Sequence, residues 1–230
     1  ELREISVETN VIHNAEGSAR VRMGKTDVLV GVKMDVGAPF PDKPNEGVLI
    51  VGAELSPLAS PLFELGPPRE DAIELARVVD RGIRESKTIE TEKLCIEEGE
   101  KVWMVLVDIQ VMNHDGNITD ASALGAIAAL HTAKIPEYDG EMVNYEKRNK
   151  KLPVKFKPVA VTLHKIGEEF FVDATLDEED VSDCRITITT KEDSNICAIQ
   201  KGGSSHLSMK EIEKAIDMAI KTGNKMRKLV

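Results

Sequence analysis

Aromatic residues and basic charge are both scarce in this sequence of 230 residues. Phe, Tyr and Trp together make up 3% of the residues, too few for an open platform on which the bases of a single strand stack. The formal net charge is -10 and the pI is about 5.1, whereas an independent nucleic-acid binder is usually basic. Any contact with a polyanion must therefore be local, or shared with another chain.

Cysteines, paired histidines and long apolar runs are also lacking. Cys95, Cys184 and Cys197 form no C-x-x-C pair and leave an odd number, which argues against a disulfide framework and a structural zinc site. The five histidines show no H-x-x-x-H spacing, so we expect no metal site and no cofactor. No run approaches the roughly 20 apolar residues of a membrane helix, and the first four residues do not begin a signal peptide. We therefore expect a cytoplasmic protein without membrane contact.

The pattern of strands and helices in the first half indicates an α+β protein. Residues 17–34 alternate around Gly24-Lys25, which predicts a β-hairpin. Residues 101–112 are nearly continuously apolar, as expected of a strand covered on both faces. Helices are predicted over 69–86 and 120–133, and the second is rich in Ala, Ser and Gly, which permits close packing. In the first helix we expect these apolar side chains to be buried: Ile73, Ala76, Val79 and Ile83.

The second half repeats the order of strands followed by a helix. Strands are predicted near 159–164, 169–173, 185–190 and 195–199. A final helix begins at Ser208, whose Ser-x-x-Glu pattern with Glu211 is typical of a capping box. We therefore predict two β-α halves that share a core, residues 1–136 and 159–230, joined by a basic linker at 137–158.

Three arginines share one face of the first predicted helix. Arg77, Arg81 and Arg84 have the spacing i, i+4, i+7, and Arg69 lies just before the helix. Guanidinium groups bind phosphate through paired hydrogen bonds, so this face is a candidate site for phosphate groups. The alternative is a solvated face with internal ion pairs, because Arg81 and Arg84 each have a carboxylate four residues away.

Carboxylates gather between positions 173 and 183. The cluster consists of Asp173, Asp177, Glu178, Glu179, Asp180 and Asp183. Such side chains serve as Mg²⁺ ligands or as a general acid in phosphoryl transfer. Acidic runs are also common in exposed turns, and spacing alone leaves both interpretations open.

Taken in order, these segments resemble the RNase PH family of phosphorolytic exoribonucleases over nearly the whole chain. The resemblance is carried by EGSARV at 16–21, the basic helix at 69–84, DIQV at 108–111 with Asp115-Gly116, and VDATLDEED at 172–180. It implies an RNase PH-like fold of the ribosomal protein S5 domain 2-like type. Within the family, the chain is similar to a non-catalytic ring subunit of the archaeal exosome.

Two departures from the family pattern imply a chain without catalytic residues. Active members carry Gly-Gly-Thr-Arg-Thr-Ala-Ser or a near variant after the turn Asp, and its Arg grips phosphate, the nucleophile of the reaction. Here Thr119 stands at that Arg, and Asp120 adds a negative charge that would repel phosphate. The resemblance thus implies a degenerate phosphate site at Thr119 and Asp120.

The second departure lies in the acidic motif. Active members carry a second Asp about six residues after the Glu-Asp of this motif, but counting from Asp180 reaches Ile186, with only the nearer Asp183 as a substitute. The resemblance therefore implies a degenerate acidic site at Asp173, Asp180 and Asp183.

The resemblance also implies partners. The chain would alternate with a catalytic RNase PH-like exosome subunit in a hexameric ring, and proteins with S1 or KH domains would cap the ring. The assembly would degrade single-stranded RNA from its 3′ end, with phosphate as the nucleophile. RNA backbone would meet the intact basic face at Arg69, Arg77, Arg81 and Arg84. Two other functions stay open: a phosphorolytic exoribonuclease or tRNA-processing enzyme in its own right, and a metal-dependent hydrolase that uses the carboxylates of 173–183.

Overall fold

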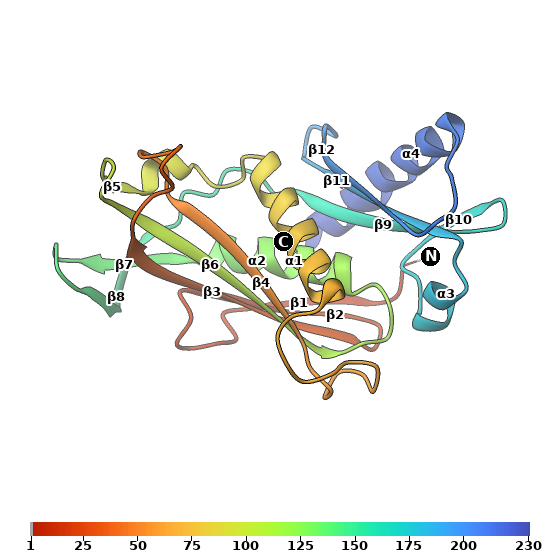
Figure 1. The fold of residues 1–230 in the computed structure, drawn as a ribbon, viewed down its shortest axis with the longest axis horizontal. Coiled ribbons are helices and arrows are strands. Elements are labelled where there is room, and N and C mark those ends of the chain that lie inside the picture. Colours follow the sequence, from red (N-terminus) through yellow and green to blue (C-terminus); the bar gives the residue numbers. More distant parts are fainter. Residues whose placement is uncertain (1) are drawn as a thin grey trace.

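The two halves of the chain form two β-sheets with helices between and outside them (Figure 1). The computed structural model describes residues 2–230. Within this range no helix is long and apolar enough to span a membrane. Strands and helices follow one another in segregated blocks, which confirms the predicted α+β class.

The first sheet has six strands in the order β1-β2-β3-β6-β4, with β5 also paired to β6. The strands are β1 Ile5–Thr9, β2 Gly17–Met23, β3 Thr26–Gly37, β4 Val48–Leu55, β5 Cys95–Glu97 and β6 Lys101–Asn113. β2 and β3 form the predicted hairpin, in which Met23 pairs with Thr26 across the turn. β4 runs parallel to β6, whereas the other pairings are antiparallel.

Strand β6 is covered on one face only, so the prediction of cover on both faces is wrong. Val105, Val107 and Ile109 are fully buried. Met104 and Leu106, on the other face, are partly exposed. The reason is that the helices of the first half pack on the same side of the sheet. The apolar run thus predicts a strand inside the sheet, but it does not predict that helices cover both faces of that sheet.

The second sheet has four antiparallel strands in the order β10-β9-β11-β12. They are β9 Val159–Ile166, β10 Glu169–Val172, β11 Cys184–Thr190 and β12 Ile196–Gly202, in agreement with the predicted strands. The stretch predicted as a basic linker contains β8 (Val143–Lys151). This strand pairs with β7 (Lys134–Tyr138) in a two-stranded ribbon, drawn at the left of Figure 1.

The helices of the described range are α1 Glu70–Glu85, α2 Ile118–Thr132, α3 Leu176–Asp180 and α4 Met209–Met226, with short 3-10 turns η1 Thr91–Leu94 and η2 Arg227–Leu229. Helix α2 contacts β2 and β3 on one side and β9 on the other, and α1 lies beside it. Helix α4 packs on β9 and β11 and lies on the outer face of the second sheet (Figure 1). The core therefore forms around α1 and α2.

Helix α2 is buried all round, as its small residues predict. Every residue from Asp120 to Leu130 is buried, and a Cβ added at Gly125 would lie 2.8 Å from Val30 Cγ2. In α1, Ala76, Val79 and Ile83 are buried as expected, but Ile73 is 48% exposed. The buried stripe of α1 is centred on the side of Ala72, Leu75 and Val79, and Ile73 lies outside it. That part of the prediction is wrong.

The predicted capping box begins α4. The side chain of Ser208 accepts a hydrogen bond from the backbone N-H of Glu211, and the Glu211 carboxylate accepts one from the backbone N-H of Ser208 at 2.7 Å. Cys95, Cys184 and Cys197 are free thiols, of which only Cys184 is buried.

The approach of β2 to α2 leads to a prediction about stability. A methyl group at Gly17 would lie 2.7 Å from Ala133 Cα, whereas one at Gly52 in β4 would come no closer than 3.7 Å to another residue. We expect Gly17→Ala to lower the free energy of unfolding by about 1–3 kcal/mol, and Gly52→Ala to change it little. Urea titrations followed by circular dichroism measure both, and equal midpoints for the two variants would contradict the packing described.

Candidate nucleic-acid interface

Helix α1 presents three arginines to solvent. It begins after two prolines, and Glu70 and Asp71 in its first turn suit the positive end of the helix dipole. Arg77, Arg81 and Arg84 are exposed, while the apolar side chains of the opposite face are buried. The amphipathic pattern thus turns the guanidinium groups outward as one stripe, called here the α1 arginine stripe.

The three arginines differ in their internal contacts. Arg84 donates to Asp80 from Nε at 3.0 Å and from Nη2 at 2.7 Å, which raises the pKa of Arg84. Arg81 donates to Gln200 Oε1 at 3.1 Å and forms no ion pair with Glu85 in residues 2–230. Arg77 has no ion pair within the same residues. Of the two internal pairs weighed from the sequence, only the one at Arg84 forms.

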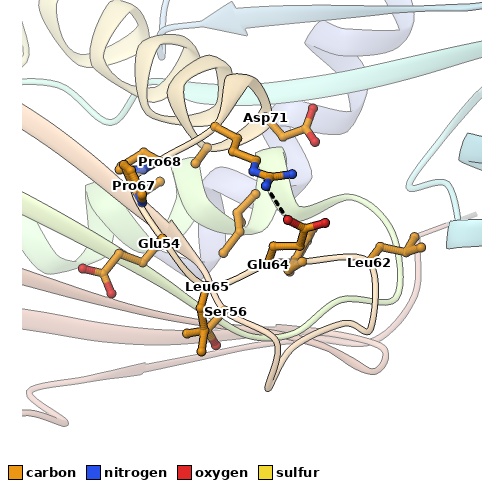
Figure 2. A pocket seen from close by; sticks show the side chains of 14 residues that line it. Glu54, Ser56, Leu62, Glu64, Leu65, Pro67, Pro68 and Asp71 are labelled. Atoms are coloured by element: carbon orange, nitrogen blue, oxygen red, sulfur yellow. Dashed lines mark hydrogen bonds and ion pairs between the residues drawn. The ribbon is translucent and has the colours of Figure 1, made fainter.

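Arg69 lies apart from the stripe, at the N-terminal end of α1. It forms an ion pair with Glu64 and lines a cavity of about 320 Å³ under the loop that joins β4 to α1, shown in Figure 2. Eight residues separate Arg69 from Arg77, roughly 12 Å along a helix axis. The structure therefore brings together Arg77, Arg81 and Arg84 and leaves Arg69 outside this group.

A second cavity, called here the α2 cleft, has a volume of about 330 Å³. It lies where the first half of α1 meets the N-terminus of α2, β9, α3 and β11. Thr119 is part of its lining. The charged side chains in the lining are Asp71, Glu74, Glu179, Asp180 and Arg185. Arg185 is paired with Glu74 at 2.6 Å, so carboxylates dominate the cleft.

The N-terminus of α2 already holds a carboxylate of the chain itself. The backbone N-H of Asn117, the residue before the helix, donates to Glu179 Oε1 at 2.8 Å. Helix N-termini attract phosphate and other anions through their free N-H groups and the helix dipole. Burial raises the pKa of Glu179 in spite of this hydrogen bond. No pattern within the acidic run distinguishes Glu179 from its neighbours, because the residue that it contacts lies 62 positions away in the sequence.

Asp120 faces the second sheet. Its carboxyl accepts hydrogen bonds from Thr162 N at 2.9 Å and from Thr162 Oγ1 at 2.7 Å. Burial raises the pKa of Asp120 to about 7. From the sequence, Asp120 is expected to repel phosphate in the site. Its carboxyl instead joins α2 to β9, and Thr119 is the member of the pair that lines the α2 cleft.

Two of the three carboxylates predicted as the acidic site have separate partners, and the third lines the α2 cleft. Asp173 is buried and accepts from Arg3 N at 2.6 Å and from Arg3 Nη2 at 2.7 Å. Burial opposes its ionisation, but the hydrogen bonds from Arg3 outweigh it and hold the pKa of Asp173 below its usual value. Asp183 accepts the backbone N-H of Gly167 at 2.7 Å, and Asp180 lines the α2 cleft. Within residues 2–230 no three His, Cys, Asp or Glu side chains are arranged to hold a metal ion.

Two histidines line the α2 cleft as neutral side chains. Burial lowers the pKa of His164 to about 4, and it also lowers the pKa of His114. Ser182 Oγ donates to a backbone carbonyl, so it accepts from His164 Nδ1 at 3.1 Å. Neither ring carries positive charge near neutral pH, and the cleft is a poor environment for an anionic nucleophile.

Ile186, which stands six residues after Asp180, is buried in β11.

Comparisons with known proteins match nearly the whole chain. Residues 1–136 match the 3′ exoribonuclease family, domain 1, and residues 158–222 match domain 2 of that family. The exosome complex component Rrp42 of Methanocella arvoryzae is 52% identical, over 99% of this chain and 86% of that protein. That of Thermococcus gammatolerans is also 52% identical, over 100% of this chain and 86% of that protein. A chain of the Archaeoglobus fulgidus exosome with RNA bound to the active site aligns with a TM-score of 0.94 and 50% identity, over 99% of this chain and 88% of that chain.

The buried Asp120 leads to a prediction about pH. The raised pKa of about 7 lies above the value of roughly 4 for an exposed Asp, so this carboxyl favours folding when protonated. The contribution of the protonated carboxyl to the free energy of unfolding is complete below pH 4 and is lost as the pH rises towards 7. We therefore expect the unfolding free energy of Asp120→Asn to rise relative to wild type between pH 4 and 7, by on the order of 1 kcal/mol per pH unit. Urea titrations across this range measure the difference, and parallel pH profiles would contradict the prediction.

Proposed function

Because this chain belongs to the 3′ exoribonuclease family and has an RNase PH-like fold, we propose that it is a non-catalytic subunit of an exosome ring. In the ring it binds RNA and supports the active site of a catalytic RNase PH-like partner. The assembled ring then degrades RNA from the 3′ end by phosphorolysis. The observation that carries this function is the α2 cleft, whose charged lining residues are four carboxylates and one arginine.

Phosphorolysis needs phosphate held as an anionic nucleophile. In the α2 cleft the guanidinium of Arg185 is paired with Glu74, and Glu179 takes the Asn117 N-H beside the helix N-terminus. The surrounding carboxylates raise the electrostatic cost of bringing phosphate in. Asp180 lines the cleft, while Asp173 and Asp183 are engaged elsewhere, so the three carboxylates of the predicted acidic site do not meet there. These contacts favour an inactive homologue.

The α1 arginine stripe supports the RNA-binding part of the proposal. Arg77 and Arg81 keep most of their donors free of internal carboxylates, while Arg84 shares its donors with Asp80. A local row of cations is sufficient for contact with phosphates even though the chain is acidic, because exposed charges act over about 10 Å at ordinary salt. Arg69, at the far end of α1, is proposed as an outlying RNA contact.

The proposed assembly is a hexamer in which this chain alternates with the catalytic subunit. Proteins with S1 or KH domains cap the ring, and the complex acts on single-stranded RNA in the cytoplasm. Relatives named as exosome components, and the similar chain in an RNA-bound exosome, support this assignment.

The proposed inactivity leads to a prediction about products. The isolated chain should release no nucleoside diphosphates from RNA at any phosphate concentration, because the α2 cleft does not hold phosphate. Adding the catalytic subunit should produce phosphate-dependent release. Product analysis with phosphate and with Mg²⁺ alone separates the alternatives. Nucleoside diphosphates from the isolated chain would indicate an active phosphorolytic enzyme, and monophosphates would indicate a hydrolase.

The α1 arginine stripe leads to a prediction about affinity. In the assembled ring, Arg81→Ala with Arg84→Ala should weaken binding of all RNA sequences alike. The salt slope should fall by roughly 0.7 for each RNA phosphate that the ring no longer neutralises, since neutralising a phosphate releases counterions. Titration of labelled RNA at several salt concentrations measures both quantities.

The matched control for this pair is Lys210→Ala with Lys221→Ala, which removes two exposed positive charges from α4. It should leave RNA affinity unchanged. If the arginine variant also keeps its affinity and loses only a few tenths of a kcal/mol of stability, the stripe is a solvated face and not an RNA contact.

A further inference from the structure

A third cavity lies at the C-terminal end of α1, away from the α2 cleft. Its volume is about 440 Å³, within the range of roughly 300–1,000 Å³ that small-molecule sites occupy. The loop before β4, the start of β4, the last turn of α1, η1 and residues 155–156 line it. We call it the α1 end cavity.

Two of the five phenylalanines in the chain line this cavity. Phe40 belongs to the loop between β3 and β4, and it is 50% exposed. Phe156 is partly buried, with Lys191 Nζ 4.7 Å from its ring centre. In a sequence with so few aromatic residues, a half-exposed ring in the lining of a cavity offers a flat apolar surface. A nucleobase stacks on such a ring with about 1–3 kcal/mol.

The cavity is also basic relative to the rest of the chain. Its basic side chains are Lys43, Arg84, Lys87, Lys93 and Lys155, and its carboxylates are Glu46, Glu90 and Glu92. Lys43 is paired with Glu46, and both Lys93 and Lys155 lie against Glu90. Lys87 forms no ion pair in the part of the chain that the structure describes. In a chain with a net charge of -10, this lysine is a free cation in a lining that also contains two aromatic rings.

Lys87 has an unusual backbone conformation. It follows the end of α1 with φ of 54°, and its N-H donates to the Arg84 carbonyl at 3.0 Å. Glycine is the usual residue in this left-handed position after a helix, because any side chain is strained there. A lysine at this position therefore costs some stability and adds a cation to the cavity lining.

The cavity continues the α1 arginine stripe. Arg84 belongs to both, since it is the last arginine of the stripe and part of the cavity lining. A strand whose phosphates follow Arg77, Arg81 and Arg84 along α1 therefore reaches the cavity whose lining also contains Lys87 and Phe40. The cations suit the phosphates of such a strand, and the aromatic ring suits one of its bases.

We propose that the α1 end cavity is a nucleotide subsite, in which a base stacks on Phe40 and the adjoining phosphate lies against Lys87 and Arg84. The subsite rests on the proposed RNA-binding function, because it lengthens the path that begins on the stripe. A free nucleotide presents the same base and phosphate, so the test has separate arms for a strand and for a mononucleotide.

The test uses the ring assembled with the catalytic subunit, in buffer without phosphate so that RNA is not degraded. The probes are a labelled oligoadenylate, an abasic strand of the same length, and AMP as a competitor. Phe40→Ala should weaken oligoadenylate binding about tenfold and leave the abasic strand unaffected, because only the base stacks. Lys87→Gly should weaken both strands about threefold, because it removes a cation that lies against the phosphate.

Two controls separate binding from folding. Lys87→Gly should keep or raise the unfolding free energy, since glycine accepts the left-handed backbone without strain. Leu58→Ala removes another exposed apolar side chain, which is 75% exposed and lies outside the α1 end cavity, and it should leave all affinities unchanged.

The AMP arm tells free nucleotides from strands. If AMP competes in wild type but not in Phe40→Ala, free nucleotides also enter the site. If AMP does not compete, the site is restricted to strands.

The outcomes distinguish this subsite from the proposed function. If Phe40→Ala and Lys87→Gly bind oligoadenylate like wild type while Arg81→Ala binds it more weakly, the subsite is refuted and the RNA-binding function stands. If Arg81→Ala has no effect, the stripe is refuted instead. If native mass measurement shows that Phe40→Ala no longer assembles with the catalytic subunit, the cavity is a subunit contact and the nucleotide subsite is overturned.

Discussion

The packing of α2 between the two sheets is the constraint on which the other features depend. Close approach of this helix to β2 and β3 requires small residues, as at Gly125, where an added Cβ would lie 2.8 Å from Val30 Cγ2. On the other side, Asp120 ties the first turn of α2 to Thr162 of β9. Because α2 touches both sheets, as α1 also does, its position helps to determine where the halves meet and where the α2 cleft opens.

The first turn of α2 is a helix N-terminus that could bind an anion, but carboxylate side chains lie around it. A helix N-terminus normally attracts phosphate, but here Glu179 accepts the Asn117 N-H and Asp120 is bonded to the second sheet. Asp173 is likewise held by Arg3. Several polar groups at and near the cleft are thus engaged within the chain, whereas Asn117 Oδ1 and His164 Nε2 have no hydrogen-bond partner in residues 2–230.

Three exposed arginines form one stripe along α1 of this acidic chain. The helix buries its apolar stripe against the core, and the arginines necessarily face outward on the opposite side. From its last turn the row of cations continues into the α1 end cavity, where Phe40 adds an aromatic surface. RNA binding by an acidic protein is physically reasonable on these terms, because phosphates respond to nearby cations more than to net charge.

Features that depend on neighbours in the chain could be predicted from the sequence alone. The β2-β3 hairpin, the capping box at Ser208 and the shared face of Arg77, Arg81 and Arg84 follow from local backbone periodicity and short-range hydrogen bonds. The family motifs likewise indicated the fold. Only the tertiary structure decided that β6 is covered on one side, that Asp120 bonds to Thr162 and that Glu179 caps the turn at Asn117. These contacts join residues far apart in sequence, so they depend on how the sheets pack around α2, which no local pattern of residues specifies.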